Sequence, residues 1–236
     1  MMSSSRLLSP PWPSSRLLRL GGLSLLLLAL GWGLWQGFTP RHPGIPDPLV
    51  DAPSAGTQQT AVFSGGCFWG LEAIFEEVAG VSQVQTGYSG GEAQTANYSR
   101  VSSGATDHAE SIAITYDPRQ VSYGQLLKIF FGAGHDPTQV NRQGVDVGRQ
   151  YRSAIFAATP EQKRAAQAYI QQLQGESVFQ RPIVTEVNDL QDFYPAEDYH
   201  QNFVERNPAH PYVLVHDLPK LQRFRQQFAP LLKSEG

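Results

Sequence analysis

Hydrophobic positions along the chain follow two different spacings from residue 60 onward. Apolar residues recur three and four positions apart from Phe68 to Val78, which is typical of one helix face, and Gly80 ends the pattern. Between Glu110 and Tyr116 every second residue belongs to one face, which is typical of a strand. The two spacings predict strands at 60–64, 84–88, 110–116, 151–157 and 183–187, and helices at 68–79, 122–130, 160–174, 196–206 and 220–232.

The order of these elements is βαββαβ, followed by further elements toward the C-terminus. This order predicts an α+β fold, namely a two-layer α/β sandwich with a ferredoxin-like split βαβ core and extra C-terminal helices. Two of the helix starts carry capping signals. Ser122 precedes Gln125 by three positions, and Thr159 precedes Gln162 in the same way with a proline between them.

A different organisation is expected before residue 60. Residues 1–16 are basic and rich in Ser, Pro and Leu, and predict a disordered N-terminus. Residues 17–38 hold one arginine and are otherwise uncharged, with a length between that of a signal-peptide core and that of a full membrane span. They predict a signal-anchor or a signal peptide, with the folded domain anchored or exported on the non-cytoplasmic side. Residues 39–59 are rich in Pro and Gly and predict a linker, so the domain is expected at 60–236.

Composition narrows the classes of partner and cofactor. The formal net charge of −3 gives no basic footprint for nucleic acid. A single cysteine excludes an intramolecular disulfide and a cysteine-rich metal site. We therefore expect no nucleic-acid partner, no metal and no bound cofactor, and a monomer.

The only cysteine, Cys67, lies where a predicted strand ends at two glycines and a predicted helix begins. Unpaired backbone N–H groups and the helix dipole are expected to lower the pKa of a thiol at this position and to favour the nucleophilic thiolate. The alternative is a small buried hydrophobic residue. Phe68 fits the apolar helix stripe, whereas Trp69 lies off it beside Glu72, so an indole next to the thiol is better explained by substrate contact.

Several polar residues are candidates to assist the thiol. Glu110 shares a strand face with apolar residues, and desolvation would raise its pKa and make it a proton donor; a solvated strand-end carboxylate is the equal alternative. We expect His108 to be an exposed loop residue. The spacing of Glu197 and His200 resembles half of a metal site, but a solvent-facing helix face explains it better. Further candidates, in or beside polar loops, are Tyr98, Asp146 and Tyr151.

Seven separate stretches in the expected order resemble the peptide methionine sulfoxide reductase A family. The resemblance runs from about Thr60 to Lys233. The stretches are GCFWG at 66–70, GYSGG at 87–91, DHAE at 107–110, HDP at 135–137, RQG at 142–144, QYRS at 150–153 and EDYHQ at 197–201.

The resemblance implies a role for each candidate. The catalytic cysteine corresponds to Cys67 and the proton-donating acid to Glu110. The two hydrogen-bonding tyrosines correspond to Tyr98 and Tyr151, the loop aspartate to Asp146, and the methyl-binding aromatic residues to Phe68 and Trp69. The implied reaction is attack of the thiolate on the sulfur of a methionine S-sulfoxide, free or in an oxidised protein, which releases methionine and leaves a sulfenic acid on the cysteine.

One departure from the family pattern bears on how the enzyme is reset. Many members have further C-terminal cysteines that resolve the sulfenic acid as a disulfide. Here the segment 207–213 ends in Val213, where some relatives have cysteine. The resemblance therefore implies regeneration by an external thiol, with thioredoxin, or glutaredoxin and glutathione, as the reductant.

Two other classes of function are compatible with a lone reactive cysteine. A cysteine hydrolase would pair Cys67 with His108 or His200 and would need an oxyanion hole. A non-catalytic module would use Cys67 only for packing, and its thiol would be poorly reactive.

Overall fold

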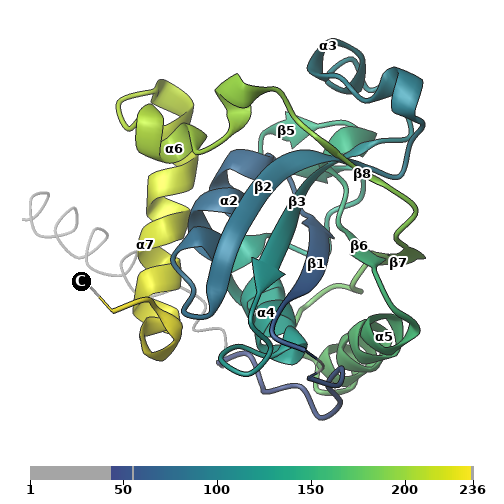
Figure 1. Ribbon diagram of the computed structural model, residues 1–236, viewed down its shortest axis with the longest axis vertical. Helices are drawn as coiled ribbons and strands as arrows, with labels where there is room; N and C mark the ends of the chain where they lie inside the picture. The colour runs from purple at the N-terminus through teal and green to yellow at the C-terminus, as the bar shows by residue number, and fades with distance from the viewer. Residues whose placement is uncertain (1–43, 55, 235–236) are drawn as a thin grey trace, which may run out of the picture. The chain divides into compact units, whose positions relative to one another are not determined.

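The computed structural model describes residues 44–54 and 56–234, shown in colour in Figure 1. The predicted disordered segment 1–16, the predicted signal-anchor or signal peptide at 17–38 and the first residues of the predicted linker lie outside the described residues. Within the described ranges, none of the helices has the length and apolar character needed to cross a membrane.

A six-stranded sheet forms the centre of the domain, with the strand order β7-β6-β1-β3-β2-β8. All neighbouring strands are antiparallel except β6 and β7, which are parallel. The strands are β1 (Gln59–Ser64), β2 (Val81–Ser89), β3 (Ala109–Tyr116), β6 (Ala154–Ala157), β7 (Glu186–Asp189) and β8 (Phe193–Pro195).

Two helices complete the predicted core. Helix α2 (Phe68–Glu76) connects β1 with β2, and helix α4 (Tyr123–Ile129) lies between β3 and β6. Because β3 lies between β1 and β2, and β1 lies between β3 and β6, each helix belongs to a split βαβ unit. The predicted α+β fold with a ferredoxin-like core is therefore confirmed.

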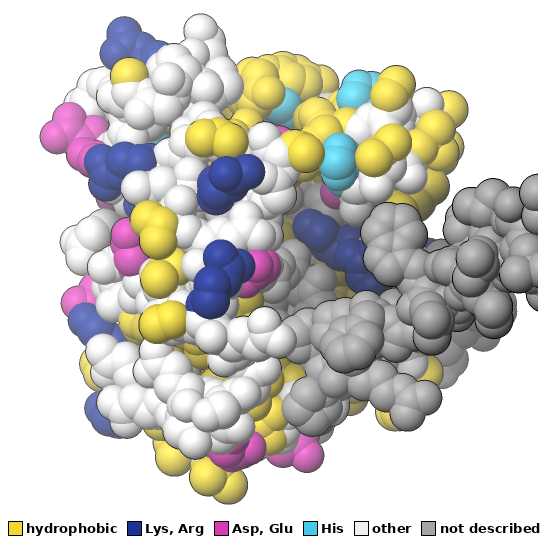
Figure 2. Space-filling view, turned by 180° about the vertical axis from the view of Figure 1, so that it is seen from behind, with side chains coloured by type: hydrophobic (Ala, Val, Ile, Leu, Met, Phe, Trp, Pro, Cys, Tyr) yellow, Lys and Arg dark blue, Asp and Glu magenta, His cyan; other side chains and the backbone are white. Residues whose placement is uncertain are grey.

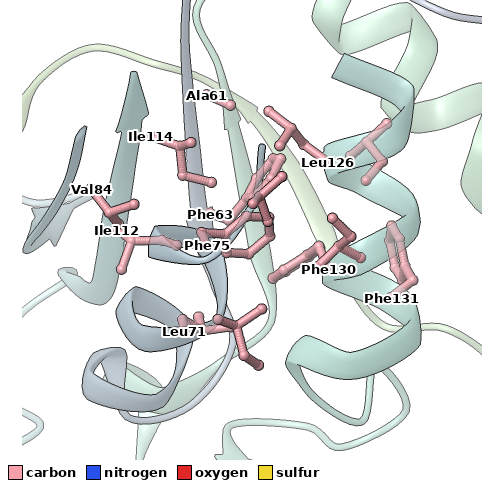
Figure 3. Packing of buried hydrophobic residues seen from close by; sticks show 14 of the residues in the cluster. Ala61, Phe63, Leu71, Phe75, Val84, Ile112, Ile114, Leu126, Phe130 and Phe131 are labelled. Atoms are coloured by element: carbon pink, nitrogen blue, oxygen red, sulfur yellow. The ribbon is translucent and has the colours of Figure 1, made fainter. Parts of the chain in front are cut away.

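The main core lies between one face of the sheet and these helices (Figure 3). Phe63 of β1 is at its centre, with its ring centroid 4.8 Å from that of Phe130 and 5.8 Å from that of Phe75. Alternation along β1 turns Val62 to the opposite face, where it packs with Phe156 in a smaller cluster. The sheet thus buries both faces, and its larger core fixes α2, whose N-terminus carries the cysteine.

The capping signals are largely as predicted. Ser122 and Gln125 form the expected reciprocal capping box at the start of α4. Thr159 caps helix α5 (Pro160–Gly175), but the side chain of Gln162 accepts from the N–H of Ala158 at 2.9 Å, so the box is only half formed. Helix α5 then connects β6 with the parallel strand β7.

The predicted helix at 196–206 is wrong. The segment folds as a 3₁₀ turn (Asp198–His200) followed by the short helix α6 (Phe203–Arg206), and Asn202 between them has a φ of 53°. The side chain of Gln201 explains the interruption, because it bonds both the N–H and the carbonyl of Thr86 on β2 at 3.0 Å. At this position the side chain of Gln201 bonds the edge of β2, and the chain does not continue as a helix.

Other elements differ from the prediction in extent. The predicted last strand begins three residues later, as β7, and β8 was not predicted. The predicted helix at 220–232 is α7 (Leu218–Gln227) with a short turn after it. Elements within predicted loops are α3 (Tyr98–Val101), the hairpin of β4 (Arg142–Gln143) and β5 (Asp146–Val147), 3₁₀ turns at Ala93–Thr95 and Arg149–Tyr151, and π-helical turns at Phe130–Gly134 and Val213–Asp217.

Residues 44–54, within the predicted linker, contact the domain. Ile45 is buried in the main core, and the Tyr169 hydroxyl donates to the carbonyl of Pro46 at 2.7 Å. Asp51 accepts from the N–H of Gly124 at 2.7 Å in the first turn of α4. This part of the segment therefore packs against α4 and α5.

Candidate active site

The turn that carries the cysteine is built from glycines. Gly66 has a φ of 88°, which favours glycine, and a Cβ there would lie 2.7 Å from the side chain of Gln143 on β4. A Cβ on Gly65 would lie 2.8 Å from the ring of His135. These close approaches place Cys67 at the N-cap of α2, as the sequence predicted.

The predicted low thiol pKa is wrong for the substrate-free site. Cys67 is half-buried, and removal of its thiol from water raises the thiol pKa well above its usual range, with Glu110 and Asp217 adding to the rise. The N–H of Trp69 in the first turn of α2 lowers the pKa, as a helix N-terminus should, but by less. The thiol of the substrate-free site is therefore protonated at neutral pH.

Glu110 lies beside the thiol and is buried. It pairs with Tyr88 across β3 and β2, its side chain is 2% exposed, and its Oε2 accepts from the N–H of Phe68 at 3.2 Å. Burial raises the pKa of Glu110 to about 8, although the Phe68 N–H opposes the rise. The solvated alternative is thus excluded, and the carboxyl group carries a proton at neutral pH.

The two predicted tyrosines lie close to this pair. Tyr98 begins α3 and Tyr151 ends a 3₁₀ turn, and both are half-buried. Burial raises the pKa of each phenol, and Glu110 and Cys67, once ionised at high pH, raise both further. Both hydroxyls therefore remain protonated donors over the whole physiological range.

Asp146 links the β4–β5 hairpin to the C-terminal part of the chain. Its Oδ2 accepts from the hydroxyl of Tyr212 at 2.5 Å. The Tyr212 ring in turn lies edge-on to Trp69, with centroids 5.8 Å apart. This contact brings a residue of β5 and a residue far along the chain to the same side of the site.

An aromatic group lies next to the thiol on α2. Phe68 is buried against Tyr88 and His200, while Trp69 is half-buried and stacks on Phe203 with ring centroids 3.7 Å apart and planes 8° from parallel. Figure 2 shows hydrophobic and histidine side chains side by side at the upper right of the view. The C-terminal segment offers exposed side chains of both kinds, His210, Leu214 and Val215.

The histidines differ from expectation. His108 is fully buried, not exposed, because its ring packs against Tyr88 and Tyr194 and its Nε2 lies 3.0 Å from the carbonyl of Glu92. His200 ends a 3₁₀ turn and does not lie on a helix face; it is buried although the other two residues of the turn are exposed, and its Nδ1 accepts from the indole N–H of Trp69. Within residues 44–54 and 56–234, both rings bond groups other than the Cys67 thiol, which argues against the cysteine–histidine pairing of a hydrolase.

Glu197 accepts hydrogen bonds from two residues of the site. Its two carboxylate oxygens accept from the Tyr88 hydroxyl and from the N–H of Tyr98, both at 2.9 Å.

The metal site suggested by the spacing of Glu197 and His200 is not seen in the described residues. Across residues 44–54 and 56–234, no group of three or more His, Cys, Asp and Glu side chains is arranged to hold a metal ion.

Three residues of the site were not identified from the sequence. Tyr212 and Asp217 lie about 150 residues beyond the cysteine in an irregular segment, and no local pattern marks them. Asp217 is buried against Gly70 of α2, and burial raises its pKa to about 6. For the third, His200, the sequence favours a helix face, with a metal ligand or a hydrolase base as the alternatives. Its place between aromatic residues depends on tertiary packing.

All seven candidate residues thus meet around the N-terminus of α2. A thiol at a helix start, a buried protonated acid and two phenols are the parts of a cysteine-dependent enzyme on an α+β scaffold. Comparison with known proteins agrees. Residues 59–231 match the family model described as peptide methionine sulfoxide reductase.

Individual relatives agree with this match. Peptide methionine sulfoxide reductase MsrA 2 of Synechocystis sp. is 71% identical over 202 residues, covering 84% of this chain and 94% of that protein. MsrA of Deinococcus radiodurans is 48% identical, covering 75% of this chain and 85% of that protein. The solved structure of methionine sulfoxide reductase A of Corynebacterium diphtheriae is 33% identical, with a TM-score of 0.58, covering 72% of this chain and 86% of that one.

The chain belongs to the peptide methionine sulfoxide reductase A family. It is an oxidoreductase that reduces methionine sulfoxide and so repairs oxidative damage. The reduced form of Mxr1 from Saccharomyces cerevisiae, 28% identical with a TM-score of 0.58 over 70% of this chain and 94% of that one, has a similar fold.

Proposed function

We propose that Cys67 attacks the sulfur of a methionine S-sulfoxide while Glu110 protonates the departing oxygen. The observation that carries the proposal is the pair itself. The N-cap of α2 holds the thiol, and the next backbone N–H, that of Phe68, holds the buried carboxyl group. A nucleophile at the start of α2 and a protonated acid of β3 are thereby held next to each other.

Cys67 and Glu110 together account for every proton in this reaction. The Cys67 proton passes to solvent as its sulfur bonds to the substrate sulfur, and the substrate oxygen takes the Glu110 proton to become a hydroxyl group. That hydroxyl group then transfers to the Cys67 sulfur as the new S–S bond and the substrate S–O bond break, which leaves a sulfenic acid on Cys67. Two electrons pass from the cysteine sulfur to the substrate sulfur, and methionine departs. The Glu110 carboxylate then recovers a proton from solvent.

The tyrosines supply the remaining donors in this proposal. With raised pKa values, the hydroxyls of Tyr98 and Tyr151 stay protonated and can donate to the sulfoxide oxygen as negative charge develops on it. The apolar surface of Phe68 and Trp69 binds the methyl group. Asp146 contributes to substrate binding on the hairpin side, where Tyr212 fixes its orientation.

Activation of the thiol depends on substrate in this scheme. The substrate-free thiol is protonated because it is partly removed from water near carboxyl groups. Transfer of the Cys67 proton is favoured once the sulfoxide accepts a hydrogen bond from Glu110 and becomes more electrophilic. The raised pKa also limits unproductive oxidation of the resting thiol.

Turnover of separate sulfoxide epimers tests the proposed function. The full chain is expected to convert methionine S-sulfoxide, free and in a peptide, and to leave the R epimer unchanged. The measurement is chiral chromatography of the residual substrate with dithiothreitol as reductant. Equal consumption of both epimers, or of neither, would contradict the proposal.

The reset of the enzyme is proposed to use an external thiol. The sequence has one cysteine, and Val213 is buried in the C-terminal π-helical turn. A thiol therefore condenses with the sulfenic acid to give a mixed disulfide and water, and a second thiol releases Cys67. Oxidised proteins and a thiol reductant, thioredoxin or glutaredoxin with glutathione, are the partners that this scheme requires.

Mass spectrometry after one turnover is expected to find Cys67 as a sulfenic acid, trapped by dimedone, or as an adduct of the added thiol. Steady-state rates with thioredoxin, with glutaredoxin and glutathione, and with dithiothreitol then identify the reductant. A disulfide-linked dimer of the chain as an obligatory intermediate would contradict both the external thiol and the monomer.

We also propose that residues 17–38 anchor the enzyme to a membrane or direct its export, with the domain on the non-cytoplasmic side. The support is the uncharged apolar composition of this segment and the arginines before it. In the producing cell, the chain is expected to resist carbonate extraction from membranes if the segment is retained, or to appear shortened in the exported fraction. A full-length chain in the cytosolic fraction would be the contrary result.

A further inference from the structure

His200 occupies the centre of the aromatic group that borders the thiol. Its side chain is 2% exposed. Its ring centroid lies 5.1 Å from that of Phe68, 5.8 Å from that of Trp69 and 4.4 Å from that of Tyr98. One imidazole thus contacts three of the residues to which the proposed function gives a role.

The hydrogen bond to Trp69 fixes the protonation state of this imidazole. The indole N–H of Trp69 is only a donor, and its Nε1 lies 3.2 Å from Nδ1 of His200. Nδ1 must therefore be an acceptor, so the ring is neutral and carries its hydrogen on Nε2. Burial, which lowers the pKa of His200, supports the neutral form, although Glu197 opposes this shift.

Nε2 has no hydrogen-bond partner within the described part of the chain, although it is buried. A buried donor without a partner destabilises the fold, and an apolar side chain of similar size would avoid that penalty. A side chain that only filled space would not need a nitrogen at either position. The acceptor at Nδ1 is therefore the property of His200 that the site uses.

The stacked ring of Phe203 cannot replace the hydrogen-bond acceptor of His200. With planes 8° from parallel, it sets the plane of the Trp69 indole but offers no acceptor to its N–H. The rings of His210 and Tyr212 lie edge-on to the indole, with centroids 6.0 and 5.8 Å away, and limit the space around it. The His200 acceptor differs from these ring contacts because it bonds one atom of the indole, Nε1, and so selects one direction of the ring.

We propose that His200 is a positioning residue for the substrate pocket, which holds the Trp69 indole in one orientation through its Nδ1 acceptor. The proposal rests on the proposed function for the part that Trp69 plays in binding the substrate methyl group. The turn that carries His200 is itself held by Glu197, which accepts from Tyr88 and from the N–H of Tyr98.

Two nearly isosteric substitutions separate positioning from packing. His200→Asn keeps an oxygen that can reach the place of Nδ1, whereas His200→Leu removes the acceptor. In the full chain, the indole N–H resonance of Trp69, identified by its loss in Trp69→Phe, is expected to shift and broaden in the Leu variant and to stay near its original position in the Asn variant. Identical spectra for the two variants would overturn the proposal.

Kinetics give a second readout in the same variants. With N-acetyl-methionine S-sulfoxide and dithiothreitol, His200→Leu is expected to raise KM and lower kcat/KM about tenfold, with a smaller change in kcat, and His200→Asn to restore most of the loss. In a Trp69→Phe background the Leu substitution should cost little more, because the indole donor is already absent. An equal loss in both backgrounds would show a packing role only.

The two readouts separate the inference from the function on which it rests. If the unmodified chain converts no S-sulfoxide, the proposed function fails, yet the indole resonance still decides whether His200 orients Trp69. If the chain is active and the resonance is unmoved by His200→Leu, the positioning role fails alone.

Discussion

Replacing Cys67 by serine is expected to abolish methionine sulfoxide reduction, with a fall in kcat of at least about 10⁴-fold. The hydroxyl is nearly the same size but far less nucleophilic and cannot form a sulfenic acid. Since the sequence holds one cysteine, no other side chain can accept the oxygen by this chemistry. The measurement is methionine formed from an S-sulfoxide peptide with dithiothreitol.

The serine variant also offers a test that the fold is retained. Cys67 contributes only a partly buried sulfur to the edge of the main core, so the free energy of unfolding should change by less than about 1 kcal/mol in a urea titration. Binding of the S-sulfoxide peptide should persist. Full turnover in this variant would refute the thiol mechanism and leave the protein with another source of reducing chemistry.

The fold could be predicted from hydrophobic spacing because its core elements are regular. Helix α2 and strand β3 each direct a regularly spaced set of apolar residues to the main core, and the order βαββαβ permits few topologies. The C-terminal quarter was harder for a physical reason. There a side chain, Gln201, pairs with β2 in place of backbone, and helical composition gives no warning of such an interruption.

The sequence predicts most of the residues that form the site but not the pKa of its thiol. Cys67 and Glu110 are recognisable from local context, one at a helix start and the other on an apolar strand face. The thiol pKa is raised first by burial, then by Glu110, and further by Asp217, which is far along the chain and packs against Gly70. His108 was expected in solvent because it follows a polar loop, yet tertiary contact with Tyr194 of β8 buries it.

Replacing Glu110 by glutamine is expected to lower the rate of sulfenic acid formation by about 10²- to 10⁴-fold. Glutamine keeps an oxygen that can accept from the Phe68 N–H but has no acidic proton to give to the sulfoxide oxygen. Reduction of the sulfenic acid by thiol should be little changed. Single-turnover quench measurements of methionine release separate the two steps.

The pH dependence of that first step identifies the proton donor. With a pKa of about 8, Glu110 is protonated and active below pH 8, so the rate should fall as pH rises through about 8. This decline should be absent in Glu110→Gln. Glu72→Gln is the matched control, because Glu72 is also buried with a pKa raised to about 8 and lies away from the thiol on α2; it should keep the decline.

The raised pKa of Glu110 also predicts that the folded state loses stability as pH rises, whereas a carboxylate in a surface ion pair has a lowered pKa and stabilises the folded state as pH rises. Glu110 holds its proton up to about pH 8 in the folded chain but releases it near pH 4.5 when unfolded, so the folded state binds more protons between these values. The free energy of unfolding should therefore fall across this window. Glu110→Gln removes that dependence, and its stability relative to the unmodified chain should rise from pH 5 to pH 9 in urea titrations. A constant difference would mean that Glu110 is ionised in the resting enzyme and cannot be its acid. The buried position that makes Glu110 a proton donor thus makes the same residue a source of instability at high pH.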